Sequence, residues 1–238
     1  MPRKKIVFVI VEGPSDDTAL GVILEKLFSS STVHVEITYG DITSDYDYDS
    51  TKIVQKVAEL IGKYAQNNHF TKYHFQQIIH LIDTDGAYVP DSSVIEDTSI
   101  SNIVYSETCI RTPRKEDIVK RNNHKKDSIN NLIRCDKIWG VPYQCYYMSC
   151  NLDHALYNKL NSTDLEKEAD SYIFAEKYKN DIPGFIDLIC HSEIAVGEGF
   201  LNSWSFIKED LHSLERHTNL GIAIESKNIT ENPVSNDE

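Results

Sequence analysis

The sequence lacks any long apolar run. None of the apolar stretches in its 238 residues approaches the about 20 residues that a membrane-spanning helix needs. The apolar run behind the basic first residues has six members and ends at Glu12, so we expect no signal peptide. The five cysteines are odd in number and include no Cys-x-x-Cys pair, which predicts reduced thiols and a cytoplasmic protein.

Glycine-rich phosphate-binding motifs are also absent. Gly197 and Gly199 flank a glutamate, but they lack the spacing and the preceding strand of a dinucleotide-binding fingerprint. No Walker-type loop is present, so any ATPase activity would have to reside in a separate chain. The histidines and cysteines show no zinc-type spacing.

Negative charge outweighs positive charge in the sequence, and the formal net charge is −13. Taken alone, this charge argues against a protein that coats nucleic-acid phosphates. Residues 111–137 are the exception, with nine Lys or Arg against four Asp or Glu. This segment is either a solvated helix face or a contact for a polyanion such as a nucleic-acid backbone. The predicted nucleic-acid contacts are Arg111, Arg114, Lys115, Lys120, Arg121, Lys125 and Lys126.

Short apolar segments alternate with amphipathic ones in the first two thirds of the chain. The pattern predicts strands at residues 5–11, 33–38, 77–82 and 142–148, and helices at residues 15–28, 51–66, 116–133 and 151–161. Residues 87–110 have the composition of a loop with weak extended pieces. The alternation predicts an α/β fold with a Rossmann-like core, in which helices flank a mostly parallel, four-stranded sheet.

The later part of the chain has a helical pattern. Helices are predicted at residues 164–179, 182–190 and 203–215. We therefore divide the chain into an α/β domain, a helical C-terminal extension and a disordered polar tail. The boundaries are residues 1–162 with a basic insertion at 111–137, then residues 163–225 and residues 226–238. The helical extension would cap the functional site or form an interface with a second copy of the chain or with a separate ATPase.

Two of the predicted strands end in carboxylates. The first, residues 6–11, is followed by the sequence EGPSD from Glu12, and the second, residues 78–82, is followed by DTDG from Asp83. Both strands are rich in β-branched residues, which is typical of strands buried on both faces. The carboxyl ends of parallel strands meet at one edge of a sheet, so we expect these acids to lie close together.

The order of these segments resembles the TOPRIM domain, the metal-binding core of topoisomerases, primases and several nuclease families. A strand that ends in Glu-Gly is followed by a helix and later by a strand that ends in Asp-x-Asp. Residues 5–160 look most like OLD-type and related small bacterial phage-defence proteins, which carry a second acid where Asp16 stands. The resemblance implies a TOPRIM-type endonuclease that uses Mg²⁺ or Mn²⁺ against DNA or RNA, tRNA included. OLD-type proteins have a fused ATPase that is missing here, so the resemblance suggests an ATPase on a separate chain.

The residue types suit phosphodiester hydrolysis. One or two divalent ions would neutralise the phosphate, activate the nucleophile and stabilise the leaving oxygen. Asp83 and Asp85 are two residues apart and would lie on one side of an extended chain. Glu12 would share their ion or act as a general acid or base. The predicted catalytic residues are Glu12, Asp83 and Asp85, and the predicted metal ligands are these three with Asp16 and Asp153.

Plainer interpretations stay open at this point. Asp16 and Asp153 would stabilise helix starts through the helix dipole, and residues 83–86 would form a turn. In a haloacid-dehalogenase-like phosphatase, Asp83 would be the nucleophile, but Ala87 stands where that family has threonine. A metal-dependent sugar-nucleotide transferase is a weaker alternative. The main alternative to a nuclease is a partner-gated or non-catalytic TOPRIM docking or sensor subunit of a defence complex.

Overall fold

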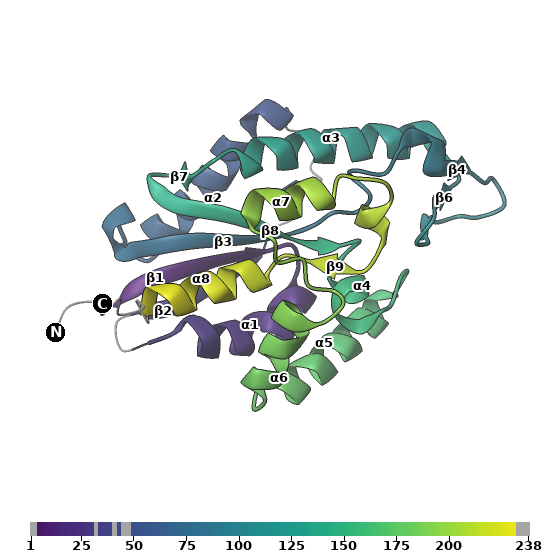
Figure 1. Ribbon diagram of the computed structural model, residues 1–238. Helices are drawn as coiled ribbons and strands as arrows, with labels where there is room; N and C mark the ends of the chain where they lie inside the picture. The colour runs from purple at the N-terminus through teal and green to yellow at the C-terminus, as the bar shows by residue number, and fades with distance from the viewer. Residues whose placement is uncertain (1–3, 31–32, 40–41, 44–48, 232–238) are drawn as a thin grey trace, which may run out of the picture.

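The computed structural model describes residues 4–30, 33–39, 42–43 and 49–231. The chain is an α/β protein, as predicted, with a twisted sheet between two groups of helices (Figure 1). No helix in this described part of the chain is long and apolar enough to cross a membrane.

The main sheet has six strands in mixed orientation. Its centre is parallel, with β2 (Val33–Tyr39), β1 (Lys5–Val11), β3 (Phe75–Asp83) and β8 (Val141–Ser149) in that order. Two short strands, β7 (Lys137–Ile138) and β9 (His217–Thr218), pair antiparallel with β8. The prediction of four mostly parallel strands is therefore right for the centre and wrong for the whole sheet. Strands of two residues are too short to produce an apolar period.

Helices cover both faces of the sheet because its central strands are apolar on both sides. Alternate residues of β1 belong to different cores: Val7 and Val9 face one, whereas Phe8 and Ile10 face the other. The first core is covered by α1 (Pro14–Phe28), α5 (Asp164–Tyr178), α6 (Ile182–Ile186) and α8 (Gly221–Glu231). The second is covered by α2 (Ile53–Asn67), α3 (Lys115–Ile133) and α7 (Phe200–Phe206).

A second, smaller sheet lies in the predicted loop at residues 87–110. It contains β4 (Val94–Glu96), β5 (Val104–Tyr105) and β6 (Ile110–Thr112), with β6 in the middle. This sheet lies at one end of α3 in Figure 1, well away from the main sheet's helices α1 and α6. Five short helical turns complete the described elements: Ser50–Lys52, Lys72–His74, Asp91–Ser93, Asp187–His191 and His212–Leu214.

Several predicted helices have different bounds. α4 (Leu152–Tyr157) ends early, because Asn158 adopts a left-handed conformation with a φ of 57°. The predicted helix at residues 203–215 is instead α7 followed by a turn and the short turn His212–Leu214. α8 extends to Glu231, into the segment that we expected to be disordered, and residues 232–238 of that segment lie outside the described residues.

The chain after residue 162 completes the core rather than forming a separate extension. Trp204 is 1% exposed, and its indole Nε1 donates a hydrogen bond to the Cys145 carbonyl at 3.2 Å. On the other face, Phe185 and Leu220 pack in the same core as the apolar side of α1. β9 adds a strand to β8. The predicted boundary at residue 162 therefore does not separate two cores.

Candidate functional site

The predicted acids meet in one pocket at the carboxyl edge of the parallel strands. The pocket has a volume of about 440 Å³ and lies between the ends of β1 and β3 and the starts of α1, α4 and α5. Its charged lining residues are Glu12, Asp16, Asp83, Asp85, Asp153, Asp164 and Lys167. The five acids that the sequence predicts as metal ligands are all among them.

Glu12 and Asp16 come from the turn between β1 and α1. Glu12 follows the last residue of β1, and its Oε1 accepts a hydrogen bond from the Thr43 hydroxyl at 3.1 Å. Asp16 Oδ2 accepts a hydrogen bond from the Gly13 backbone N–H at 2.9 Å, just before the first turn of α1. Asp16 therefore caps the start of α1, as its plainer interpretation predicts, and it also lines the pocket.

Asp83 and Asp85 reach the pocket from different backbone conformations. Asp83 ends β3, and its Oδ1 accepts a hydrogen bond from the Leu152 backbone N–H at 3.0 Å. Asp85 has a φ of 45°, so the predicted alternation along an extended chain does not apply to it. Gly86 follows with a φ of 82°, and a Cβ there would lie 2.5 Å from Ile110 Cδ1. The tight turn therefore requires glycine at residue 86.

Residues from α4 and α5 form the opposite side of the pocket. Asp153 is 5% exposed, and its Oδ2 lies 3.6 Å from Lys167 Nζ. Asp164 lines the same side from the first turn of α5. Sequence reasoning missed Asp164 and Lys167, because the helical pattern after residue 163 did not indicate how α5 would be oriented.

Lys125 is the largest correction to the predicted site. It was predicted to contact a nucleic-acid backbone, yet its side chain is 1% exposed. Lys125 Nζ lies 3.3 and 3.4 Å from the two carboxylate oxygens of Glu12, and it also donates a hydrogen bond to Asp85 Oδ2. A buried ammonium in contact with two carboxylates cannot contact an outside polyanion in this conformation. The prediction that Lys125 contacts a nucleic-acid backbone is therefore wrong for the conformation that the structure shows.

Arg121 also belongs to the site rather than to an open surface. Its Nη2 donates hydrogen bonds to the Asp85 backbone oxygen at 2.8 Å and to the Tyr105 hydroxyl at 2.7 Å. Arg111 pairs with Asp97, and Arg114 lies 3.6 Å from Asp117. The other predicted contacts, Lys115, Lys120 and Lys126, are partly or fully exposed on α3.

Crowded negative charge changes the acidity of the site. Burial raises the pKa of Asp83 well above its usual range, and the negative charge of Glu12 raises it further. Burial raises the pKa of Asp16 to about 6. Burial also acts to raise the pKa of Asp85, but the positive charges of Lys125 and Arg121 outweigh it and lower that pKa overall. The pocket is thus an environment in which an additional cation would be stabilised.

The donor chemistry fits a hard divalent cation. Mg²⁺ and Mn²⁺ prefer oxygen ligands, and the pocket offers carboxylate oxygens from five predicted ligands. Within the described ranges, no three His, Cys, Asp or Glu side chains are grouped as a ready-made ligand set. Lys125 instead lies between two of the carboxylates, Glu12 and Asp85. The residue types therefore suit the metal, whereas the local arrangement is built around an ammonium group.

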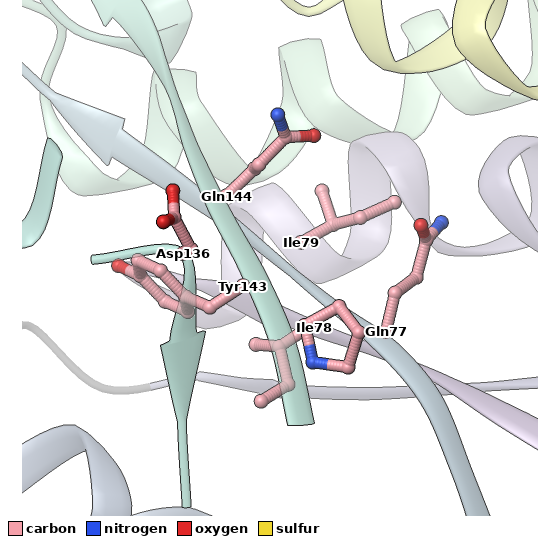
Figure 2. A pocket seen from close by; sticks show the side chains of 7 residues that line it. Gln77, Ile78, Ile79, Asp136, Tyr143 and Gln144 are labelled. Carbon is pink, nitrogen blue, oxygen red and sulfur yellow. The ribbon is translucent and has the colours of Figure 1, made fainter. Parts of the chain in front are cut away.

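A second pocket lies at the opposite, amino-terminal edge of β3 and β8. Its volume is about 240 Å³, and Figure 2 shows Gln77, Asp136, Tyr143 and Gln144 around it. Asp136 supplies its one carboxylate among the described residues. This pocket does not bring acids together, so the candidate site is the pocket at the carboxyl edge.

The site has to be interpreted from its own chemistry. Comparisons of the chain with protein-family models, with curated proteins and with solved structures found no match.

Proposed function

We propose that this chain is a metal-dependent nuclease that hydrolyses phosphodiester bonds of DNA or RNA. The observation that supports it best is the convergence of Glu12, Asp83 and Asp85 in one pocket, with Asp16 and Asp153 on its sides. The TOPRIM-like order of these acids along the chain favours a nuclease over other metal-dependent enzymes. A role in anti-phage defence is part of the same proposal.

Glu12, Asp83 and Asp85 would hold the metal ion, and Asp16 and Asp153 would support it. When bound, Mg²⁺ or Mn²⁺ supplies charge neutralisation at the phosphate and an activated water nucleophile. The chain's own contribution is to fix the acids. Leu152 N–H orients Asp83, and the Thr43 hydroxyl orients Glu12.

Positive groups of the chain would bind the substrate around these acids. Lys167 lines the pocket and is 39% exposed, so it is available to a phosphate at the rim. The exposed lysines of α3 would hold the nucleic-acid backbone further out. An excess of acids in the pocket requires the metal to make the phosphate's approach favourable.

Cleavage of mixed substrates tests the proposal. Supercoiled plasmid, single-stranded DNA and total tRNA would be incubated with Mg²⁺, Mn²⁺ or EDTA. We expect metal-dependent cleavage by the wild type and its loss in a Glu12→Gln/Asp83→Asn variant. Asp136→Asn, at the opposite edge of the sheet, is the matched control and should retain activity. Equal cleavage by the wild type and the double variant would show that another protein or another site is responsible.

A partner-gated TOPRIM docking or sensor subunit is the second candidate. The feature that favours it is an apolar stripe on α5, where Leu165, Tyr172 and Ile173 are between 61% and 79% exposed. The first turn of the same helix lines the pocket through Asp164 and Lys167, so a protein bound to α5 would act on the site. Thermal stabilisation by Mg²⁺ without any cleavage of the three substrates would favour this candidate.

A further inference from the structure

The position of Lys125 has a consequence for metal binding. Its ammonium group contacts Glu12 and Asp85, two of the three proposed principal ligands. The residue is held in place by α3, whose inward face packs Ile118, Ile129 and Leu132 into the protein. The ammonium is therefore a built-in cation between two of the carboxylates.

Burial of a lysine is costly unless its charge is paired. Lys125 meets this condition through two carboxylates at once, and it relieves part of the repulsion among the acids in return. An ammonium group is compact and takes up the space between the oxygens that it contacts. A metal ion that bound both Glu12 and Asp85 would need that same space.

We propose that Lys125 is an internal competitor of the metal ion, and that its ammonium must leave the carboxylates of Glu12 and Asp85 when the ion binds. This inference rests on the proposed function, because it assumes that these acids are metal ligands. Glu12 and Asp85 line the pocket, so an ion in it would reach the same carboxylates that Lys125 contacts. Metal binding then carries the cost of breaking the Lys125 ion pairs.

A substrate phosphate would recover this cost. A displaced ammonium needs an anion, and the phosphate of a bound nucleic acid is the anion that the proposed reaction brings to the pocket. Metal and nucleic acid would therefore strengthen each other's binding, and this coupling is reciprocal. Without substrate, the wild type would hold the metal weakly.

Calorimetric titration with Mg²⁺ in the absence of nucleic acid tests the competition. The proteins are the wild type, Lys125→Met and Lys125→Gln, with Lys126→Met as the neighbouring control on α3. We expect Mg²⁺ to bind at least about tenfold more tightly to both Lys125 variants and equally to the control. The glutamine variant keeps a hydrogen-bonding side chain and serves where the methionine variant does not fold without metal. Equal or weaker binding by the folded Lys125 variants would overturn the proposal.

A second titration uses a phosphorothioate-linked oligonucleotide, which resists hydrolysis. In the wild type we expect the oligonucleotide to tighten Mg²⁺ binding at least fivefold, and in the Lys125 variants to have no such effect. The same tightening in both would contradict the coupling. Failure of the wild type to bind either Mg²⁺ or the oligonucleotide would reject the proposed function. If the wild type cleaves nucleic acid but the Lys125 variants bind Mg²⁺ no more tightly than the wild type does, only the proposed competition is rejected.

Discussion

His80 is a neutral histidine buried in the middle of β3, three residues before Asp83. Its ring is 1% exposed, and Nδ1 forms a hydrogen bond of 2.8 Å with the Tyr143 hydroxyl. Burial and the positive charge of Lys125 lower its pKa from 6.5 to about 3. Folding therefore depends on keeping this side chain uncharged.

Acid should destabilise the protein through His80. Between pH 6.5 and about 3, the unfolded chain binds a proton on this residue and the folded chain does not. Lowering the pH through this range therefore stabilises the unfolded state relative to the folded state. The contribution approaches about 1.4 kcal/mol per pH unit in that window and is absent above it. In His80→Asn, we expect the free energy of unfolding to fall less steeply from pH 7 to pH 5.

Urea unfolding of both proteins at pH 7, 6 and 5 measures this difference. His191→Asn, at an exposed position, is the control for the same substitution outside the core. Parallel curves for the wild type and His80→Asn would show that His80 is charged in the folded protein or is not buried.

Some residues of the site could be located from the neighbouring sequence, whereas others depend on contacts with residues far away in the chain. Glu12, Asp16 and Asp83 could be assigned from the sequence, because a buried strand and the first turn of a helix fix where they lie. Asp85 lines the same pocket as Glu12 and Asp83, but the argument that placed it there was wrong, since a positive φ is not visible in an apolar period. Lys125 was misplaced because a lysine among other charged residues favours the surface, and only its distant partners explain its burial.

Among the elements, α3 combines a buried face that contains polar groups with exposed positions that carry lysines. Its inward face holds polar groups, Asn122, Lys125 and Ser128, between apolar residues, which is why its apolar period is weak in the sequence. Its other positions carry the lysines that the sequence predicts as backbone contacts. The helix itself could therefore be predicted, whereas its inward face could not.

Charge reversal on the outer side of α3 tests its predicted contact with nucleic acid. We expect Lys120→Glu/Lys126→Glu to weaken binding of single-stranded DNA and to lower the slope of log K against log salt by about 1.4. The reason is that two fewer phosphates would be neutralised. Lys177→Glu, near the far end of α5, is the control and should change the slope little.

Fluorescence anisotropy at a series of salt concentrations provides the measurement. An unchanged slope in the double variant would remove α3 from the nucleic-acid interface. Lys125 is excluded from this experiment because its reversal would place a third carboxylate against Glu12 and Asp85.

At the scale of the whole molecule, the C-terminal third is part of the same structure as the site. The Thr84 hydroxyl, between Asp83 and Asp85, donates a hydrogen bond to the Ser213 carbonyl at 3.1 Å. The Asn219 side-chain oxygen accepts a hydrogen bond from the Tyr147 backbone N–H at 2.8 Å. The loop of the acids is thus tied to residues more than 120 positions later.

Truncation after residue 162 should therefore abolish cooperative folding. The deletion would expose the apolar side of α1 and leave Tyr147 and Met148 without β9 and α7. We expect a shortened protein that aggregates or binds a dye specific for exposed apolar surface. Deletion of residues 232–238 is the control and should leave the melting temperature unchanged, because every described element remains.

Circular dichroism during heating and size-exclusion chromatography distinguish the two deletions. A folded, monomeric protein of residues 1–162 with a sharp unfolding transition would contradict this prediction. The sequence could not reveal this dependence, because β9 has only two residues and the helical pattern around it is compatible with a separate domain.

The late position of β9 and α8 has a consequence for biosynthesis. The four parallel strands are translated before β9, which extends β8, and before α8, which covers part of one face. A nascent chain on the ribosome must therefore carry an incompletely covered sheet until these two elements have been made. We expect the protein to depend on chaperones that bind growing chains.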